Sequence, residues 1–389
     1  MPRRRPVPGA AAVSAVLIIA TAGCTTVAIL ASSQTVSAAT SSSPWTGSFT
    51  AVALPPRVDQ VKSTTCVNAE DCWAVGEAVG RGATESSAAV IATTNGGRRW
   101  MSQPIPAGIG TLNDISCSDR QHCVAVGQSD QTPNSGSAVL VTTNGGATWI
   151  AAPPLAGVSD MTTVSCRADR HCLAIGTNNT TGAVYASSPG TSTWTSVGTL
   201  PPGVEGASAV SCTDDRHCWV TGFTATDPLH LSGAVVATSN GGSTWTSLPV
   251  PAGTGFLNGI TCTQGSGDRA AASCVAVGTS AVAQGQTRTG HGQILTSSNA
   301  GLSWTPEPVP TAVATLFDVS CPSVGICAAV GSTPAASAQA GVTVLTGTGR
   351  APWQHPTVLT MPLSMSGVWC VSTSNCAVVG GAYTAYLRS

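Results

Sequence analysis

The chain has 389 residues, of which 42% are hydrophobic and only 8% are charged, and its formal net charge is −1. A pI near 6.6 excludes the strongly basic surface that nucleic-acid binding requires. The hydrophobic share is ample for a core, and the dominance of Gly, Ser, Thr, Ala and Val favours short strands joined by tight turns. We therefore expect a folded all-β protein that does not bind nucleic acid.

Residues 1–43 form a segment of their own, predicted to be an export signal or membrane anchor with a short linker. Three arginines, Arg3 to Arg5, precede an apolar run from Ala10 to Ala31, and Val36-Ser37-Ala38 suits cleavage by a signal peptidase. Two alternatives stay open. The run could remain as an uncleaved anchor, or Cys24, in a sequence that resembles a lipobox, could be lipidated. All three place the rest outside the cytoplasm, secreted or held at the outer side of the cytoplasmic membrane through this segment alone.

Cysteine spacing supports export. Besides Cys24, fourteen of the fifteen cysteines fall into seven local pairs. Regular, even pairing in an exported chain predicts disulfides, whereas zinc ligands usually stand closer together, so no metal is expected. The predicted disulfides are Cys66–Cys72, Cys117–Cys123, Cys166–Cys172, Cys212–Cys218, Cys262–Cys274, Cys321–Cys327 and Cys370–Cys376.

The first cysteines of these pairs recur at steps of 51, 49, 46, 50, 59 and 49 residues. A period of this size indicates either propeller blades or a helical array. Each repeat contains short β-branched runs separated by Gly, Asn and Pro, which are strands and turns. Four strands, A to D, are therefore expected in each repeat, with the cysteine pair joining strands A and B. Residues 44–389 are predicted to be a seven-bladed β-propeller with one disulfide per blade.

The last repeat predicts how the ring closes. It starts at Cys370 and ends with the chain, and it lacks strand D and the Trp that follows strand C elsewhere. The missing strand is available at the other end, after Trp45 and through Val52 to Leu54. We expect this N-terminal strand to pair beside Ala382 to Leu387 and so remove an exposed sheet edge.

The turns between strands C and D resemble the Asp-box, or BNR, repeat of the sialidase-like propeller superfamily. The pattern stands here as Thr142-Thr143-Asn144-Gly145-Gly146-Ala147-Thr148-Trp149, with Asn in place of the family Asp. The chain looks most like the non-enzymatic group that includes photosystem II assembly-factor-like proteins and exported bacterial propellers. The resemblance implies the fold, and fold analogy alone does not assign an activity.

Sialidase chemistry is not expected, because the only tyrosines are Tyr185, Tyr383 and Tyr386, without a Glu near them in sequence. The D–A and B–C loops form the face on which we expect binding, since variable loops on a rigid scaffold usually carry it. The candidates that precede or begin strand A on this face are Asp59, Lys62, Asn113, Asp114, Asp160, Glu205, Asn258 and Asp318.

The leading hypothesis is an exported, non-catalytic binding or scaffold propeller, a monomer without cofactors, that engages an envelope protein or a cell-envelope glycan. The alternative is a glycosidase or lyase that uses a carboxylate pair near the central channel, involving Asp114 and Asp318. Trp73, Trp219 and Trp369 are predicted to pack between blades. Asp119, Asp169 and Asp215, in the A–B turns, are each followed by Arg and His and are interpreted as turn residues rather than metal ligands.

Overall fold

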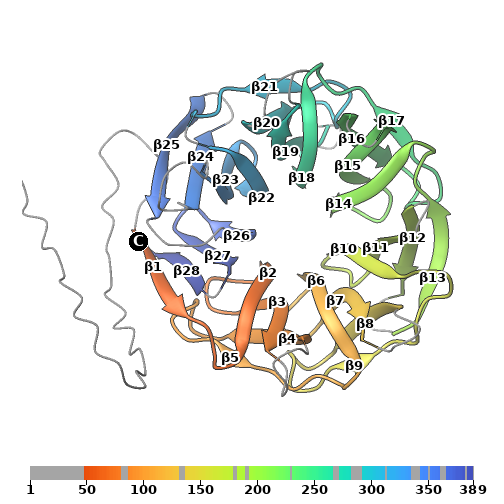
Figure 1. The fold of residues 1–389 in the computed structure, drawn as a ribbon, viewed down its shortest axis with the longest axis vertical. Coiled ribbons are helices and arrows are strands. Elements are labelled where there is room, and N and C mark those ends of the chain that lie inside the picture. Colours follow the sequence, from red (N-terminus) through yellow and green to blue (C-terminus); the bar gives the residue numbers. More distant parts are fainter. Residues whose placement is uncertain are drawn as a thin grey trace, which may run out of the picture. The chain divides into compact units, whose positions relative to one another are not determined.

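The computed structural model describes residues 48–79, 86–130, 136–177, 182–188, 192–227, 230–265, 271–281, 291–311, 313–333, 342–348, 351–359, 365–381 and 383–388. These residues form 28 strands, arranged as seven antiparallel sheets of four strands each. Figure 1 shows the sheets in a ring, with the first strand of each contiguous sheet nearest the centre. The export segment and Cys24 lie outside the described residues.

Six sheets consist of four consecutive strands, which we call blades 1 to 6. Blade 1 contains β2 (Val58–Cys66), β3 (Cys72–Val79), β4 (Ser86–Thr93) and β5 (Met101–Ser102). Blade 2 contains β6 (Ile109–Cys117), β7 (Cys123–Ser129), β8 (Ser137–Thr142) and β9 (Ile150–Ala151). Blade 3 contains β10 (Asp160–Cys166), β11 (Cys172–Thr177), β12 (Gly182–Ser187) and β13 (Trp194–Thr199).

The other three contiguous blades follow the same order. Blade 4 contains β14 (Val204–Cys212), β15 (Cys218–Asp227), β16 (His230–Thr238) and β17 (Thr246–Leu248). Blade 5 contains β18 (Thr254–Thr263), β19 (Ser273–Ser280), β20 (Gly292–Ser297) and β21 (Thr305–Glu307). Blade 6 contains β22 (Thr315–Ser323), β23 (Ile326–Ser332), β24 (Val342–Thr348) and β25 (Ala351–Leu359).

The seventh sheet is a composite of the two ends of the described chain, and we call it blade 7. It joins β26 (Gly367–Ser372), β27 (Asn375–Gly380) and β28 (Tyr383–Arg388) to β1 (Ser48–Ala53). Strand β1 pairs with β28 over its whole length, from Ser48 opposite Arg388 to Ala53 opposite Tyr383. The prediction of seven blades therefore has to be restated: six blades are contiguous in the sequence, and the remaining sheet exists only because distant segments meet.

All seven predicted cysteine pairs form disulfides. In six sheets the two cysteines are directly opposed in the A–B ladder, as Cys117 and Cys123 are. Blade 6 departs from this expectation, because a register shift between Ser320 and Ser323 removes Cys321 from the regular ladder. The disulfides place the propeller in an oxidising, extracytoplasmic environment.

A bulge interrupts strand A in every contiguous blade, four residues before the first cysteine. In blade 2 the register shifts between Leu112 and Asp114, which leaves Asn113 out of the ladder. Gly127, on strand β7, lies against this bulge, and a Cβ there would overlap the carbonyl oxygen of Thr111. Glycine is required at this position because the bulged backbone occupies the space of a side chain. The equivalent glycines in blades 1, 4, 5 and 6 meet the same obstacle and are Gly76, Gly222, Gly278 and Gly331.

The hydrophobic core lies between blades rather than in one central mass. Alternate residues of each strand face the neighbouring sheets, so that blades 1 and 2, for example, share a cluster containing Val75, Val90, Leu112 and Ala125. Trp73 belongs to this cluster, and its indole N–H donates to the carbonyl oxygen of Gly145 in blade 2 at 3.1 Å. The indole N–H of Trp219 donates likewise to Ala300 in blade 5, which confirms the predicted inter-blade packing of both residues.

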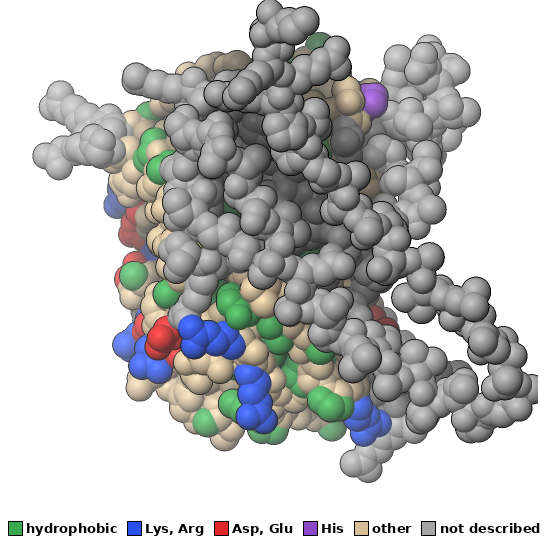
Figure 2. Space-filling model, turned by 90° about the vertical axis from the view of Figure 1, so that its left-hand side faces the viewer, with side chains coloured by type: hydrophobic (Ala, Val, Ile, Leu, Met, Phe, Trp, Pro, Cys, Tyr) green, Lys and Arg blue, Asp and Glu red, His purple; other side chains and the backbone are tan. Residues whose placement is uncertain are grey.

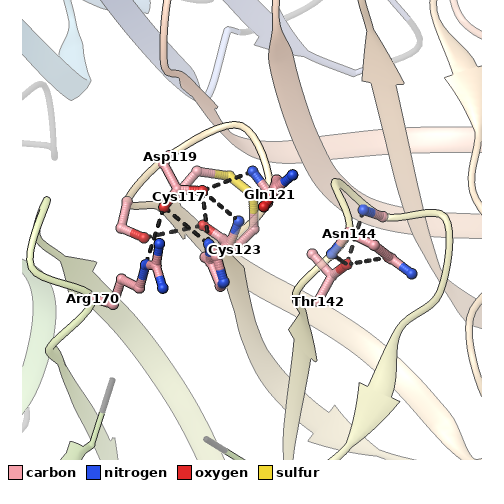
Figure 3. Close-up of polar contacts among 10 residues, drawn as sticks. Cys117, Asp119, Gln121, Cys123, Thr142, Asn144 and Arg170 are labelled. Carbon is pink, nitrogen blue, oxygen red and sulfur yellow. Dashed lines mark hydrogen bonds and ion pairs between the residues drawn. A yellow bond between two sulfur atoms is a disulfide. The ribbon is translucent and has the colours of Figure 1, made fainter. Parts of the chain in front are cut away.

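The C–D turns are held by side chains. In blade 2 the Thr142 hydroxyl donates to Asn144 Oδ1 and accepts from the Gly146 N–H, and Asn144 Oδ1 also accepts from the Thr148 N–H (Figure 3). Gly145 and Gly146 have φ values of 70° and 87°, which glycine adopts without strain. Thr93 with Asn95, Thr238 with Asn240 and Ser297 with Asn299 repeat the arrangement. Asn thus closes a turn at this position, as the sequence predicts.

The described residues contain no helix of the length and apolarity that a membrane crossing requires. Figure 2 views the molecule from the side that carries β25, β1 and β28, where charged side chains are interspersed with small polar and apolar ones.

Candidate functional site: the central channel

The seven A strands surround a channel cavity of about 360 Å³. Its lining repeats around the ring because each A strand presents the same positions to the channel. The bulged residue of each contiguous blade reaches the cavity, and Ser366 takes that place in blade 7. The full set is Lys62, Asn113, Thr162, Ser208, Asn258, Phe317 and Ser366. The bulge is therefore the backbone feature that positions the channel side chains.

Bulged residues connect neighbouring blades. The Lys62 ammonium donates to the Thr111 hydroxyl in blade 2 at 2.9 Å and forms an ion pair with Glu77 at 2.7 Å. The Asn113 side-chain N–H group donates to the Asp160 carboxylate in blade 3 at 2.9 Å. We call Glu77, Lys62, Thr111, Asn113 and Asp160 the polar row. It places fixed donors and acceptors across three blades.

The row contains one ammonium group and two carboxylates. The hydrogen bond from Lys62 lowers the pKa of Glu77, so the Glu77 carboxylate is ionised at neutral pH. Burial raises the pKa of Asp160, although its hydrogen bond from Asn113 opposes the rise. Side-chain exposures of 27% for Lys62 and 30% for Glu77 leave both reachable by a ligand.

Asp114 occupies the next position toward the cysteine and holds three blades together. Its Oδ1 accepts from the Ser63 hydroxyl at 2.7 Å and from the Ile115 N–H at 2.8 Å. Its Oδ2 accepts from the Thr163 hydroxyl at 2.9 Å and from the Val164 N–H at 2.8 Å. A carboxylate has about four lone-pair positions, and here all are used. Burial raises the pKa of Asp114, and these hydrogen bonds limit the rise.

Asp318 is the equivalent residue of blade 6, but it has fewer partners. Its Oδ1 accepts from the Val319 N–H at 2.8 Å, and its Oδ2 accepts from the Val368 N–H at 2.9 Å. The positions that hold Ser63 and Thr163 around Asp114 are glycines here, Gly259 and Gly367. Burial, together with the smaller effect of the charge of Asp114, raises the pKa of Asp318 to about 7 despite the two backbone hydrogen bonds. Asp318 still lines the cavity and keeps part of its surface accessible.

The serine residues that directly precede the first cysteine of a repeat form a second link between blades. The Cys166 N–H donates to Ser116 Oγ at 2.9 Å, and the Cys370 N–H donates to Ser320 Oγ at the same distance. Ser165 and Ser211 accept in the same way from Cys212 and Cys262. These four hydroxyls bring polar oxygen atoms to the lining of the channel.

Trp369 stands at this position in blade 7, and the prediction that it packs between blades is wrong. Its side chain is 37% exposed, whereas Trp73 and Trp219 are 4% and 3% exposed. It lines the channel cavity, as the small polar residues at the same position of other blades do. The difference arises from strand position: Trp73 and Trp219 lie on B strands between sheets, whereas Trp369 lies on an A strand at the channel edge.

The structure separates the predicted binding residues into two groups. Lys62, Asn113, Asp114, Asn258 and Asp318 line the channel cavity, and Asp160 contacts it through Asn113. Asp59 and Glu205 are exposed on β2 and β14, outside the residues that line the cavity. Sequence reasoning assigned Trp369 to packing between blades and did not single out Thr111 or Glu77. The position four residues before the first cysteine of each repeat was the available signal for the lining residues. The repeat pattern alone does not show that the backbone bulges there.

The A–B turns carry ion pairs between blades on the opposite face. The Asp119 carboxylate accepts from the backbone N–H groups of Gln121 and His122, contacts the His122 ring, and pairs with Arg170 of blade 3 at 3.3 Å (Figure 3). Although partial burial acts to raise it, these hydrogen bonds lower the pKa of Asp119 to about 2.

Blade 4 corrects one detail of the turn prediction, because Asp214, not Asp215, accepts the backbone hydrogen bonds of its turn. Within the described residues, no group of three or more His, Cys, Asp or Glu side chains is placed to hold a metal ion.

The arrangement of strands defines a β-propeller, and solved structures agree. No family model matches the chain, and no curated protein matches it in sequence. The structure titled "YCF48 bound to D1 peptide" is 13% identical with a TM-score of 0.59, over 90% of this chain and 97% of that one. Virginiamycin B lyase from Staphylococcus aureus is 11% identical with a TM-score of 0.53, over 88% and 99%.

An ancestral GH74 enzyme is 12% identical with a TM-score of 0.57, over 87% of this chain and 46% of that enzyme. These neighbours are all β-propellers. At such low identity the likeness shows the fold alone.

Proposed function

We propose that this protein is an exported, non-catalytic binding propeller that holds a polypeptide of the cell envelope at the side of the channel where its D–A loops lie. The polar row carries the proposal. Lys62, Thr111, Asn113 and Asp160 are fixed by one another across blades 1 to 3, so a ligand would meet polar side chains that need little ordering. The propeller YCF48, which has a similar fold and was solved bound to D1 peptide, supports a peptide ligand for this scaffold.

The glycosidase alternative requires two carboxylates that share the work of acid and base or nucleophile. Asp114 and Asp318 are the candidates from sequence, and both line the channel. Asp114 has its four acceptor positions filled by Ser63, Ile115, Thr163 and Val164, so it has no lone pair left for a substrate or a water molecule. Among the described residues that line the channel, Asp318 therefore has no second carboxylate free to act with it, which favours binding over hydrolysis.

Site-specific photo-crosslinking in the producing cells tests the proposed face. A photoreactive residue replaces Asp59 or Glu205, which are exposed beside the D–A loops, or Asp215, which is exposed in an A–B turn and serves as the control. We expect one envelope protein to crosslink from residues 59 and 205 and not from 215. The crosslink should weaken in a Lys62→Gln, Asn113→Ala double variant.

Crosslinking from residue 215 alone, or from no position, contradicts the proposal. So does turnover of an envelope glycan by the purified protein that disappears in Asp318→Asn.

A further inference from the structure

Among the described residues, Asp318 has no counter-ion. The strands that pack against β22 are β18, β19, β20, β23 and β26, and none of their residues is charged. The charged residues that line the cavity are Lys62, Asp114 and Asp318, and Lys62 is already paired with Glu77. The uncompensated charge in the described channel is therefore negative. An ionised carboxylate that is buried without a cation is costly, and the cost is removed when the group is protonated or when a ligand supplies a cation.

The surroundings of Asp318 also leave part of its hydrogen-bonding capacity unused. At the equivalent residue Asp114, the hydroxyls of Ser63 and Thr163 occupy one lone pair of each oxygen. Gly259 and Gly367 stand in those places beside Asp318 and bring no hydroxyl. Two acceptor positions of the Asp318 carboxylate are thus unused, and Asp318 lines a cavity of about 360 Å³, which admits a small organic molecule.

An aromatic side chain lines the same cavity from the strand that Asp318 contacts. Asp318 accepts its hydrogen bond from the Val368 N–H, and Trp369 is the next residue on that strand. Its partly exposed indole lines the same cavity. Indole faces attract organic cations, and a carboxylate beside the indole supplies the opposite charge. A neutral saccharide could stack on the indole and donate hydroxyl groups to the carboxylate, but only a cation would also neutralise its charge.

We propose that the channel binds a small organic ammonium cation between the Asp318 carboxylate and the Trp369 indole. The cation takes the two open acceptor positions through N–H or polarised C–H groups, and its apolar substituents lie on the indole. This site is separate from the polar row and does not rest on the peptide-binding function.

Binding of the cation should depend on pH, because it is coupled to the ionisation of Asp318. The cation binds the ionised form of Asp318, whose pKa is about 7 in the free protein. Affinity therefore rises as the pH increases through 7, by about ten-fold between pH 6 and pH 8 for one such group. The other ionisable residues of the channel are Asp114, which is saturated with hydrogen bonds, and Lys62, which is paired with Glu77.

The test uses the full, disulfide-intact chain and choline chloride as the probe, with 3,3-dimethyl-1-butanol as its neutral isostere. Isothermal titration at pH 8 should show saturable binding of one choline and at least about ten-fold weaker binding of the isostere. Trp369→Ala and Asp318→Asn should each weaken choline binding by about ten-fold or more, and Trp369→Phe by less. Asp215→Asn, an exposed carboxylate on a turn, should leave it unchanged.

Proton NMR gives a second readout. The trimethylammonium signal should shift upfield in the complex, as expected for methyl groups over an indole face, and the shift should vanish in Trp369→Ala. The proposal is overturned by absence of saturable choline binding, by equal binding of the isostere or of a methyl glycoside, or by unchanged binding in Asp318→Asn. If Asp318→Asn does not fold, an affinity of the wild-type protein that is flat between pH 6 and pH 8 overturns it equally.

Discussion

Asp114 accepts a hydrogen bond from the backbone N–H of Val164 at 2.8 Å, and this bond joins the inner strands of blades 2 and 3. With Ser63 on the other side, the carboxylate spans three blades. Asp318 makes the corresponding bond to Val368 but lacks the two hydroxyl partners. The same residue type at the same repeat position is therefore a saturated structural link in blade 2 and an open acceptor in blade 6.

The first prediction concerns this difference. Asp114→Ala leaves two hydroxyls and two backbone N–H groups without their acceptor, and we expect it to lower the free energy of unfolding by about 3–5 kcal/mol. Asp318→Ala removes only two backbone partners and relieves an unpaired carboxylate, so its cost should be about 1–2 kcal/mol. Urea denaturation followed by tryptophan fluorescence measures both, and equal costs would contradict the distinction.

The stability of the protein should fall as the pH rises from about 4 to 7. Burial raises the pKa of Asp318 to about 7 in the folded state, so the folded protein holds that proton more tightly than the unfolded chain. This tighter proton binding contributes up to about 4 kcal/mol of stability. The contribution is complete below the unfolded pKa near 4 and is lost as the pH increases through 7. Denaturation midpoints measured from pH 4 to 8 should decline in the wild type and decline less in Asp318→Asn.

Below about pH 4, stability should instead fall as the pH decreases. The pKa values of Asp119 and Asp169 are lowered to about 2, so their contributions are complete above pH 4 and disappear as the pH falls toward 2. Both carboxylates are well exposed, and solvent screening keeps their contribution small. A stability maximum near pH 4 is expected, and a maximum at pH 8 would contradict both assignments.

Gly127→Ala should destabilise the protein by about 2–4 kcal/mol, because the new Cβ overlaps the bulged backbone at Thr111 and Leu112. It should also displace Asn113 and weaken partner binding at the polar row. Gly157→Ala is the control: its φ of 75° strains alanine, but nothing lies within 4 Å of the added Cβ. Its cost should be about 1 kcal/mol. If thermal unfolding ranks the two variants in the reverse order, the bulge does not require glycine.

Removing strand β1 should open the ring. A chain that starts at residue 54 loses every pairing of Ser48–Ala53 with β28 and exposes that strand as an edge. We expect a large fall in the unfolding temperature and concentration-dependent association, relative to a chain that starts at residue 44. Differential scanning calorimetry and light scattering measure the two effects, and equal unfolding temperatures would show that β1 does not close the ring.

Two inter-blade ion pairs of the A–B turns should differ in strength. Arg120 pairs at 2.8 Å with Asp71, whose side chain is 6% exposed, whereas Arg170 pairs at 3.3 Å with Asp119, which is 37% exposed. Arg120→Ala leaves a buried carboxylate without its cation and should cost about 1–3 kcal/mol, while Arg170→Ala should cost less than about 0.5 kcal/mol. Unfolding at low and high salt distinguishes them, because the Asp71 carboxylate is buried and its interaction is screened less than that of the exposed Asp119.

The sequence alone determined the features that repeat. Cysteine spacing predicted the seven disulfides, and Thr142 with Asn144 predicted a turn, because both depend on residues a few positions apart. The N-terminal strand that completes blade 7 was also predictable, since the last repeat visibly lacked one. Local chemistry and periodicity carry this information without a three-dimensional structure.

Tertiary structure decided what each repeated position does. Asp114 and Asp318 share a place in the repeat, and only the neighbouring blades show that hydroxyls saturate one and glycines leave the other open. Trp369 has a large apolar side chain of the kind expected in a core, but it lies at the channel because its strand is the innermost of its blade. Contacts between blades join residues about 50 positions apart, as Asp114 to Val164 shows, and the surroundings of a side chain there depend on which strands the closed ring brings together.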